Sequence, residues 1–436
     1  MIVMKFGGTS VGSAQRIKNL VPLINKGEQK IVVLSAMSGT TNLLVDISVS
    51  LYSKDLLKLK QQIDELDQRY KKVIDELFSK KDSIISANEL LAEHLNFINL
   101  FTLDLFTANE EKAILAQGEL LSTALLHLYM IEQNISSVLM PALEFMRIDE
   151  SEEPEVLFIK KMISKTMEQF GDENLFITQG YICRNSFGEI DNLKRGGSDY
   201  TATLIGAAVN AAEIQIWTDI DGLHNNDPRI VEKTFAVTEL SFDEAAELAY
   251  FGAKILHPTC VLPAKKENIP VRLLNTMQPT ATGTIISNKP APDRITAIAA
   301  KDNLTAIKIK SARMLLAYGF LRAVFEVFER YKTPIDMIST SEVAVSLTID
   351  NDKHLEEIIG ELEQFGLVEV DKNQTIICIV GTFGADKQGY ASRIFDSLKN
   401  IPIRMISYGG SENNISLLVN SDLKKKALVS LNKGLF

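Results

Sequence analysis

The first 48 residues alternate between β-rich runs and helix patterns. Ile2–Phe6 is a short apolar run that ends in a Gly-Gly turn, and Ser13 can cap the helix that follows. Lys30–Leu34 is a second β-rich run, followed by another turn and another helix pattern. Strands that alternate with helices form parallel sheets, because parallel strands must be joined by a crossover connection. The chain is therefore predicted to open with an α/β domain.

A helical section comes next. Apolar residues recur there at spacings of three and four, with charged residues between them, at Leu56, Leu59, Ile63, Leu66, Tyr70, Val73 and Leu77. The spacing predicts an amphipathic helix of about 22 residues, and helix patterns continue over 86–105 and 114–131. Two interpretations stay open. The helices form an insertion at about 51–131 that packs on the α/β body, or the first helix forms an intermolecular coiled coil, for which about three heptads are short.

Strand patterns return beyond this section, at 138–139, 175–178, 181–183 and 213–217. A helix of small residues is predicted over Thr201–Val209. The clearest linker is Asn-Lys-Pro-Ala-Pro at 288–292, where two prolines and few apolar residues mark a domain boundary.

Beyond the linker the sequence repeats itself. Gly319-Phe320 and Gly389-Tyr390 each precede an amphipathic helix pattern, and the two glycines are 70 residues apart. Each helix pattern is followed by a similar strand start, Pro334-Ile335-Asp336 in the first copy and Pro402-Ile403-Arg404 in the second. A repeat that occurs twice is no solenoid. We expect two small α/β modules that sense a ligand.

Composition and charge exclude several classes of protein. The net charge of −10 argues against a general binder of nucleic acids or anionic membranes. The N-terminus lacks the features of a signal peptide, and the best candidate for a membrane helix, 114–131, contains Gln117, Glu119 and His127. Three scattered cysteines suit a reducing compartment. We expect a cytoplasmic protein.

The first strand and its glycine turn have the composition of a phosphate site. Lys5 stands on the strand, and Gly7-Gly8 lies between it and the helix start. Glycines let backbone N–H groups approach a phosphate closely, a helix start adds positive potential, and lysine adds a mobile cation. Gly-Gly alone also makes ordinary turns. The Walker A pattern, the HRD and DFG motifs of protein kinases and the dinucleotide pattern GxGxxG are absent.

Three further segments combine residue types that bind ligands. Arg195–Asp199 joins a guanidinium, which binds carboxylates bidentately, to a glycine-rich helix start. Trp217–Gly222 places a hydroxyl and carboxylates at the end of a strand, where ligands bind in open α/β sheets. Phe251–Lys254 places a lysine after Gly-Ala. The first two of these segments can also be read as turns. No His, Cys or carboxylate group has metal-ligand spacing, so no protein-held metal site is predicted.

Six motifs, in this order, resemble the aspartokinases of the amino-acid kinase family. They are KFGGTSV at 5–11, LSAMSGTTN at 34–42, QGE at 117–119, KRGGSDYTA at 194–202, TDIDGLHNNDPR at 218–229 and FGAKILHP at 251–258. The C-terminal repeat resembles a pair of ACT modules. The resemblance implies a mostly parallel sheet sandwiched by helices in a catalytic domain at 1–290. Two ferredoxin-like ACT modules would follow, the first at 304–371 and the second at 295–303 plus 372–436.

The resemblance also implies roles for individual residues. The catalytic residues would be Lys5, against the transferring phosphoryl group, and Asp199, which would organise Lys5 and the reacting groups. The aspartate site would consist of Ser35, Thr41, Glu119, Arg195 and Ser198, with Glu119 accepting the substrate ammonium and Arg195 clamping the carboxylate. ATP would be held by Lys5, Gly7, Gly8, Thr218, Asp219, His224, Arg229 and Lys254, where His224 replaces a tyrosine of many relatives.

An amino-acid effector is implied in the first module, which is most similar to that of lysine-sensitive aspartokinases. Its pocket would comprise Met314, Gly319, Phe320, Leu321, Ile335, Asp336 and Ser341. Asp336 aligns with Arg404 of the second module, and a carboxylate can receive a ligand ammonium where a guanidinium cannot. Asp336 can also be read as a solvated residue at a strand start. An α-ammonium is common to all amino acids, so the choice of lysine over threonine follows from the resemblance.

The implied reaction is phosphorylation of aspartate by ATP to 4-phospho-L-aspartate, the first step of the lysine, threonine and methionine (diaminopimelate) pathway. Mg²⁺ would arrive with ATP and be held mostly by phosphates and water. No dehydrogenase-like segment follows the second module, so a monofunctional enzyme is expected, as a homodimer or dimer of dimers through the ACT modules. Two alternatives are another enzyme of the family, such as a glutamate kinase, and a non-catalytic amino-acid sensor.

Overall fold

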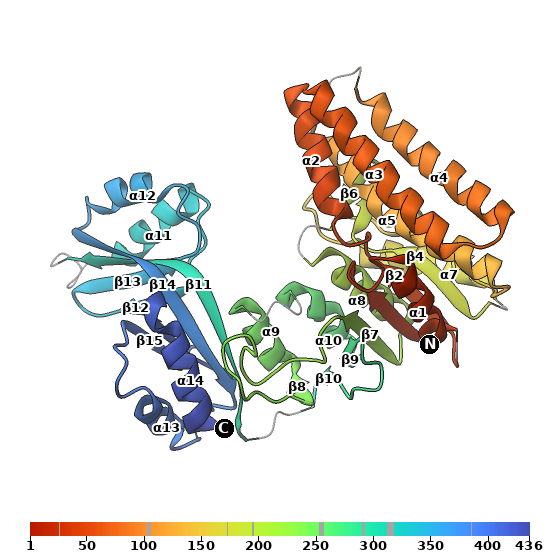
Figure 1. Cartoon of the computed structure of the whole chain (residues 1–436). Coiled ribbons are helices and arrows are strands. Elements are labelled where there is room, and N and C mark those ends of the chain that lie inside the picture. Colours follow the sequence, from red (N-terminus) through yellow and green to blue (C-terminus); the bar gives the residue numbers. More distant parts are fainter. Residues whose placement is uncertain are drawn as a thin grey trace. The chain divides into compact units, whose positions relative to one another are not determined.

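A computed structural model describes residues 1–25, 27–102, 106–171, 173–193, 196–252, 257–289, 293–311, 318–384 and 386–436. The chain divides into two compact units, Met1–Leu223 with Leu256–Asn288, and His224–Ile255 with Lys289–Phe436 (Figure 1). The second limit of this division adjoins the predicted proline linker. The segment His224–Ile255 was predicted within the catalytic domain, but it packs as part of the second unit.

The sheet of the first unit is mostly parallel, as predicted. Its strands lie in the order β3-β4-β2-β1-β7-β9-β10, and only the pair β9–β10 is antiparallel. The bounds are β1 (Ile2–Phe6), β2 (Lys30–Leu34), β3 (Val138–Leu139), β4 (Leu175–Gln179), β7 (Glu213–Thr218), β9 (Val271–Asn275) and β10 (Thr284–Ser287). The N-terminal strand β1 lies between β2 and β7, so that the predicted glycine turn leaves the middle of the sheet.

Helices cover both faces of this sheet. All five side chains of β2 and all five of β4 are buried, and successive side chains of a strand point to opposite faces. Met4 and Phe6 of β1 belong to a core that side chains of five helices complete, α1 (Ala14–Ile24), α2 (Thr40–Ser53), α3 (Leu56–Leu77), α4 (Lys81–Leu100) and α5 (Ala108–Glu132). Lys5 alternates with Met4 and Phe6, so its side chain points to the other face. There α8 (Gly197–Val209) packs on β1, β2 and β7.

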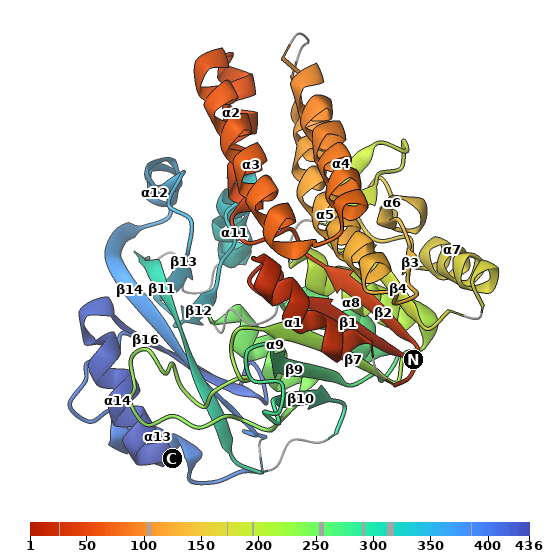
Figure 2. The same cartoon turned by 45° about the vertical axis from the view of Figure 1, so that its right-hand side comes forward.

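The helical section is an insertion, as the first interpretation expected. The helix α3 spans the 22 predicted residues, and all of its predicted apolar positions except Leu56 are buried in the core of the first unit. Figure 2 shows α2 to α5 side by side. The helix α4 begins at Lys81 rather than Ser86, because the Glu132 carboxylate of α5 accepts the N–H groups of Ser79 and Lys80 at 3.1 Å. That cap comes from a distant helix, so the local pattern could not show it.

The helix α5 is long and apolar enough to cross a membrane by length and composition, but 72% of its most apolar window is buried inside the protein. Such burial is typical of the core helix of a globular domain. The remaining elements of the first unit are α7 (Val156–Gln169) and several short ones: α6 (Ala142–Phe145), β5 (Ile182–Arg184), β6 (Ile190–Asn192), the 3₁₀ turn Pro258–Val261 and α10 (Leu262–Lys266).

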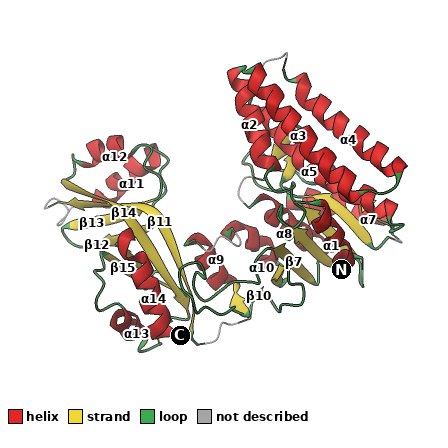
Figure 3. Ribbon diagram, viewed as in Figure 1, coloured by secondary structure: helices red, strands yellow, loops and turns green. Residues whose placement is uncertain are grey.

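The second unit is built on one sheet in the order β12-β13-β11-β14-β16-β15. The bounds are β11 (Ile295–Lys310), β12 (Met337–Thr340), β13 (Ala344–Ile349), β14 (Leu367–Gly381), β15 (Met405–Tyr408) and β16 (Asn414–Asn420). The strands β11 and β14 pair over their whole length (Figure 3). The first copy of the repeat extends one half of this pair through β13, and the second copy extends the other half through β16.

The predicted repeat is confirmed element by element. Gly319 and Gly389 both adopt left-handed backbone angles, with φ of 84° and 86°, and each caps a helix. The first copy contributes α11 (Phe320–Arg330) and α12 (Leu355–Leu362), and the second contributes α13 (Tyr390–Ser397) and α14 (Lys424–Leu435). The unit also contains β8 (Glu239–Ser241) and α9 (Phe242–Tyr250), which precede it in the sequence.

Candidate active site

Lys5 and Asp199 form an ion pair where β1 meets α8. The Lys5 Nζ lies 2.7 Å from the Asp199 Oδ1, and the two side chains are only 10% and 15% exposed. Lys5 lies one residue before the end of β1, and Asp199 lies in the first turn of α8. The cation is therefore fixed at the carboxyl end of a central strand, where ligands bind in open α/β sheets.

The helix α8 begins earlier than predicted. It starts at Gly197 rather than near Thr201, and Gly196 caps it in a left-handed conformation with φ of 68°. Ser198 consequently lies in the first helical turn, where the Ser35 hydroxyl donates to its Oγ at 2.9 Å. The start of α8 thus meets the loop after β2 at a pair of hydroxyls.

The glycine turn after β1 packs closely on the same loop. A Cβ on Gly8 would lie 2.7 Å from the Ala36 carbonyl oxygen, and the Ser38 N–H donates to the Gly8 carbonyl at 3.0 Å. A Cβ on Gly7 would lie 3.6 Å from the Lys5 Nζ. Glycine is required at position 8 by the approach of the two loops, and at position 7 it leaves the space beside the Lys5 ammonium open.

Glu119 lies on α5 and faces the loop after β2. Its carboxylate is buried, and its Oε1 accepts the Ala36 N–H at 3.1 Å. Burial raises the pKa of the Glu119 carboxyl to about 7, although the Ala36 N–H opposes this change. The Oε2 atom has no hydrogen-bond partner among the residues that the structure describes. A buried carboxylate oxygen without a partner is costly, so this atom is suited to a ligand cation.

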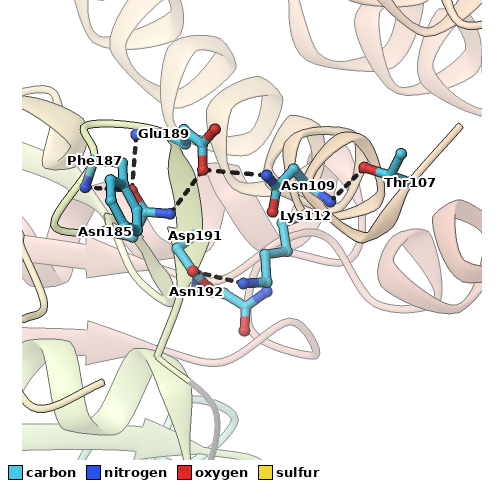
Figure 4. A network of polar contacts seen from close by, with 8 residues as sticks. All are labelled: Thr107, Asn109, Lys112, Asn185, Phe187, Glu189, Asp191 and Asn192. Carbon is cyan, nitrogen blue, oxygen red and sulfur yellow. Dashed lines mark hydrogen bonds and ion pairs between the residues drawn. The ribbon is translucent and has the colours of Figure 1, made fainter. Parts of the chain in front are cut away.

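Polar contacts fasten α5 to the β5–β6 hairpin (Figure 4). The Lys112 Nζ lies 2.6 Å from the Asp191 Oδ2. The Asn109 and Asn185 side-chain amides both donate to the Glu189 Oε2, at 3.1 and 3.0 Å. The hairpin leads into the loop before α8, so these contacts restrain the helix that carries Glu119 relative to the segment that carries Ser198.

Two residues of α3 support the loop after β2, and the sequence did not single out either for the site. The Arg69 guanidinium donates to the Ser38 carbonyl. The hydroxyl of Tyr70, a fully buried residue, lies 3.2 Å from the Thr40 Oγ1. The predicted substrate residue Thr41 is half-buried in the first turn of α2, directly after Thr40. The helical insertion thus supports the loop after β2 through these two contacts.

Tyr181 is a further residue that the sequence did not single out. Its φ of 68° is left-handed, which is rare for a bulky residue and is often found at functional sites. A Cβ on Gly197 would lie 2.4 Å from the Tyr181 ring. Burial, the Glu119 charge and other nearby charges raise the Tyr181 pKa to about 12. The ring therefore packs against the start of α8, where the Glu119 charge contributes to the raised pKa of its hydroxyl.

The predicted ATP residues are divided between the units. Thr218 ends β7, where its Oγ1 accepts the Ile220 N–H at 3.2 Å, and Asp219 is exposed beside it. In the second unit the His224 Nδ1 lies 2.8 Å from the Thr234 Oγ1. Arg229 is 80% exposed and pairs with Asp227 at 2.8 Å. Lys254 and the predicted substrate residue Arg195 lie outside the described residues.

Comparison with known proteins identifies the family. A model of the amino acid kinase family matches residues 1–275, and an ACT-domain model matches residues 377–435. The lysine-sensitive aspartokinase 3 of Escherichia coli (strain K12) is 31% identical over 466 residues, covering 100% of this chain and 99% of the relative. This chain is an aspartokinase.

Solved structures agree with that family. The E. coli aspartokinase III in complex with aspartate and ADP (R-state) matches with a TM-score of 0.86 at 31% identity, over 100% of both chains. The same enzyme with lysine and aspartate (T-state) matches with a TM-score of 0.82 at 31% identity, over 100% of this chain and 99% of that one. The predicted amino-acid kinase fold with ACT modules is thereby confirmed.

The predicted effector residues of the aspartokinase gather around the first copy of the repeat. Gly319 caps α11, and Phe320 and Ile335 pack against its core. Leu321 and Ser341 are exposed, and Met314 lies outside the described residues. Asp336 is not a solvated residue at a strand start, since its side chain is 1% exposed. That alternative was wrong.

No group of three or more His, Cys, Asp or Glu side chains able to hold a metal occurs within the described ranges. The donors that Mg²⁺ prefers are oxygens, many of which phosphates and water supply in kinases.

Proposed function

We propose that this aspartokinase transfers a phosphoryl group from ATP to the β-carboxylate of L-aspartate and forms 4-phospho-L-aspartate. The observation that carries the proposal is the buried Lys5–Asp199 ion pair at the end of β1, beside the Gly7-Gly8 turn. The E. coli relative that matches in fold was solved with aspartate and ADP, which is the pair of ligands that such a reaction requires.

The chemistry needs positioning and charge rather than a strong base. A carboxylate with a reference pKa near 4 is ionised at neutral pH, so the nucleophile is ready without deprotonation. Phosphoryl transfer then depends on holding the groups in line and neutralising the developing charge. Lys5 supplies a fixed cation, and Asp199 keeps it at the strand end. The glycine turn supplies N–H groups that phosphate oxygens can approach.

We assign the substrate ammonium to Glu119. Its unpartnered Oε2 is buried, and an ammonium would compensate the burial that raises its pKa. The hydroxyl of Ser35, in the loop after β2, contacts that of Ser198 in the first turn of α8. The two hydroxyls can orient a substrate carboxylate. Arg195 and Thr41 keep the carboxylate-binding and substrate-lining roles that the family resemblance gives them. Glutamate is one methylene longer than aspartate, a difference that pockets discriminate by about 10- to 200-fold.

Nucleotide binding would involve Gly7, Gly8, Thr218 and Asp219 of the first unit. The resemblance adds His224, Arg229 and Lys254, of which His224 and Arg229 are described in the second unit. Kinases that use ATP depend on a divalent metal in general, and we propose Mg²⁺ here. The ion would neutralise phosphate charge, while Lys5 and the glycine turn fix the position of the transferring group.

We further propose that lysine inhibits the enzyme by binding to the first ACT module. The E. coli relative is named lysine-sensitive, and its structure was also solved in complex with lysine and aspartate. Asp336 supplies a buried carboxylate for an ammonium group. The strands β12 and β15 stand at the ends of the sheet order and carry the exposed side chains Ile338 and Ile406. These two strands contact each other within the chain, so the homodimer, or dimer of dimers, through the modules is proposed from the family resemblance.

Phosphorylation assays with aspartate and with glutamate test the proposal. The acyl phosphate can be trapped with hydroxylamine and ADP release followed in parallel. We expect hydroxamate formation with aspartate at a kcat/KM at least tenfold above that with glutamate. A preference for glutamate would establish the other family activity. No turnover with either acceptor, in a chain that still binds lysine, would establish a non-catalytic sensor.

A further inference from the structure

The predicted effector carboxylate is already occupied by a cation of the chain itself. Asp336 lies directly before β12, and its Oδ1 accepts from the Lys301 Nζ at 2.6 Å and from the Tyr250 hydroxyl at 2.9 Å. All three residues belong to the second unit. Since the Asp336 side chain is only 1% exposed, an incoming ammonium cannot touch it unless side chains that cover it move.

The cluster carries more negative than positive charge. The Lys301 Nζ also lies 2.9 Å from the Asp350 Oδ2, so one ammonium serves two carboxylates. The Asp336 Oδ2 atom is buried and has no hydrogen-bond partner in the part of the chain that the structure describes. Leaving a buried carboxylate oxygen unpaired costs free energy. The cluster is therefore built to accept a cation at Asp336.

Lys301 has a second ion-pair partner, Asp350, that it can keep when it leaves Asp336. Its side chain is 20% exposed, and its other partner, Asp350, is 40% exposed, whereas Asp336 is almost fully buried. Burial alone would lower the Lys301 pKa, but hydrogen bonds to Asp336 and Asp350 raise it above its usual value. A lysine that leaves Asp336 keeps its charge and its contact with Asp350, so the exchange creates no unpaired buried ammonium.

Lys301 is the last regularly paired residue before an irregularity in its strand. The pairing of β11 with β14 shifts register between Lys301 and Leu304, at the junction of the two halves of the sheet. Asn303 there adopts a left-handed φ of 61°. Bulges of this kind change the direction of neighbouring side chains. The contact of Lys301 with Asp336 is therefore made next to an irregular part of β11.

We propose that Lys301 is an internal stand-in for the effector's ammonium group. It holds Asp336 while the site is empty and gives way, retaining Asp350, when an amino acid binds. This inference rests on the proposed function, because it takes Asp336 as the ammonium acceptor of the effector site. Lys301 thus competes with the effector for Asp336. The apparent affinity for the effector is the intrinsic affinity multiplied by the fraction of molecules in which Lys301 has left Asp336.

Calorimetric titration of the full chain with L-lysine tests the proposal, in the absence of ATP and aspartate. Lys301→Met removes the competing ammonium and should bind lysine at least tenfold more tightly than the wild type. Asp336→Asn should bind at least tenfold more weakly. Lys310→Met is the matched control, because it removes another lysine of β11 that pairs with a carboxylate, Glu369. It should leave lysine affinity unchanged.

Asp350→Asn supplies a prediction of the opposite sign. It deprives the displaced Lys301 of its alternative partner, so lysine binding should weaken severalfold. This variant retains the buried Lys301–Asp336 pair and keeps the test available if Lys301→Met does not fold, which thermal melting will show. Unchanged or tighter binding by Asp350→Asn would contradict the exchange.

The outcomes separate this inference from the proposed function. If the wild type binds no lysine, or if Asp336→Asn binds lysine as well as the wild type, the effector site itself is misassigned. If Asp336→Asn weakens binding but Lys301→Met fails to tighten it, the effector site stands and Lys301 is a structural partner only. The stand-in role would then be overturned while the kinase assignment is untouched.

Discussion

The Lys5 ammonium lies 2.7 Å from the Asp199 carboxylate, in a pair that joins the central strand β1 to the first turn of α8. The contact fixes a cation at the end of the strand, with its side chain only 10% exposed. A carboxylate beside a phosphate-binding turn would repel the ligand if it stood alone. Paired with Lys5, it would instead hold the ammonium in place for the phosphoryl group in the reaction that we propose.

We expect Lys5→Met to lower kcat by about 100-fold or more, because a lost contact to developing charge typically costs about 3 kcal/mol of transition-state stabilisation. Steady-state kinetics with aspartate and ATP measure the loss. Arg272→Met is the matched control, since it breaks another ion pair, with Glu213 at 2.8 Å, at the opposite end of β7. If Lys5→Met keeps more than a tenth of the wild-type kcat, the role assigned to Lys5 is wrong.

The aspartate KM should depend on pH through Glu119, whose pKa burial raises to about 7. The ammonium of aspartate needs the ionised carboxylate, which gains a proton as the pH falls through 7. The KM should therefore rise by about tenfold between pH 8 and pH 6, while the ATP KM changes little. In Glu119→Gln the aspartate KM should be high and flat over this range. A flat profile in the wild type would rule out titration of this carboxylate on binding.

Gly180→Ala should damage the substrate site through packing. Its added Cβ would lie 2.5 Å from the Ser198 Cβ, so the start of α8 must shift and disturb the hydrogen bond between Ser35 and Ser198. We expect kcat/KM for aspartate to fall at least tenfold, with a loss of about 1–3 kcal/mol in stability. Gly360→Ala is the control: it lies exposed in α12 with nothing within 4 Å, and should stabilise the fold by about 0.5–1 kcal/mol. Equal kinetics of both variants would show that α8 tolerates the shift.

Tyr250→Phe should separate lysine binding from inhibition. Tyr250 is the last residue of α9 and donates to Asp336, and Lys254, with its implied nucleotide role, follows four residues later in the sequence. Without the hydroxyl, lysine has one bond fewer to displace and should bind severalfold more tightly. Without this hydrogen bond, the binding of lysine at Asp336 also no longer changes a contact of α9, so maximal inhibition should fall. Calorimetry and inhibition curves together check both effects, and parallel changes in affinity and inhibition would contradict the coupling.

The sequence anticipated the parts of the fold and site that depend on local pattern. The period of α3, the glycine turns before α11 and α13 and the place of Lys5 on β1 follow from short segments. The family resemblance supplied the roles of these residues, and the structure shows that Lys5 contacts Asp199 and that Ser35 contacts Ser198.

Contacts between distant segments could not be predicted in this way. Arg69 reaches Ser38 from a helix that the pattern describes only as amphipathic. Gly-Gly-Ser-Asp has low helix propensity, so the early start of α8 depends on packing against β1 and β2. The segment His224–Ile255 packs with the second unit because α9 contacts β11 and β14, a pairing that no local pattern records.

The packing of α9 has a consequence for synthesis on the ribosome. The Glu247 carboxylate accepts from the side chains of Ser411 and Asn414, which lie 164 and 167 residues further along the chain. At about 5–20 residues per second, a nascent chain must wait roughly 8–33 s after Glu247 is made before these contacts can form. Until then α9 can pack on β11 and β14 but lacks these two hydrogen bonds. A polypeptide stalled before Ser411 would therefore hold this helix less firmly and should be cleaved faster there by proteases, whatever the state of its kinase sheet.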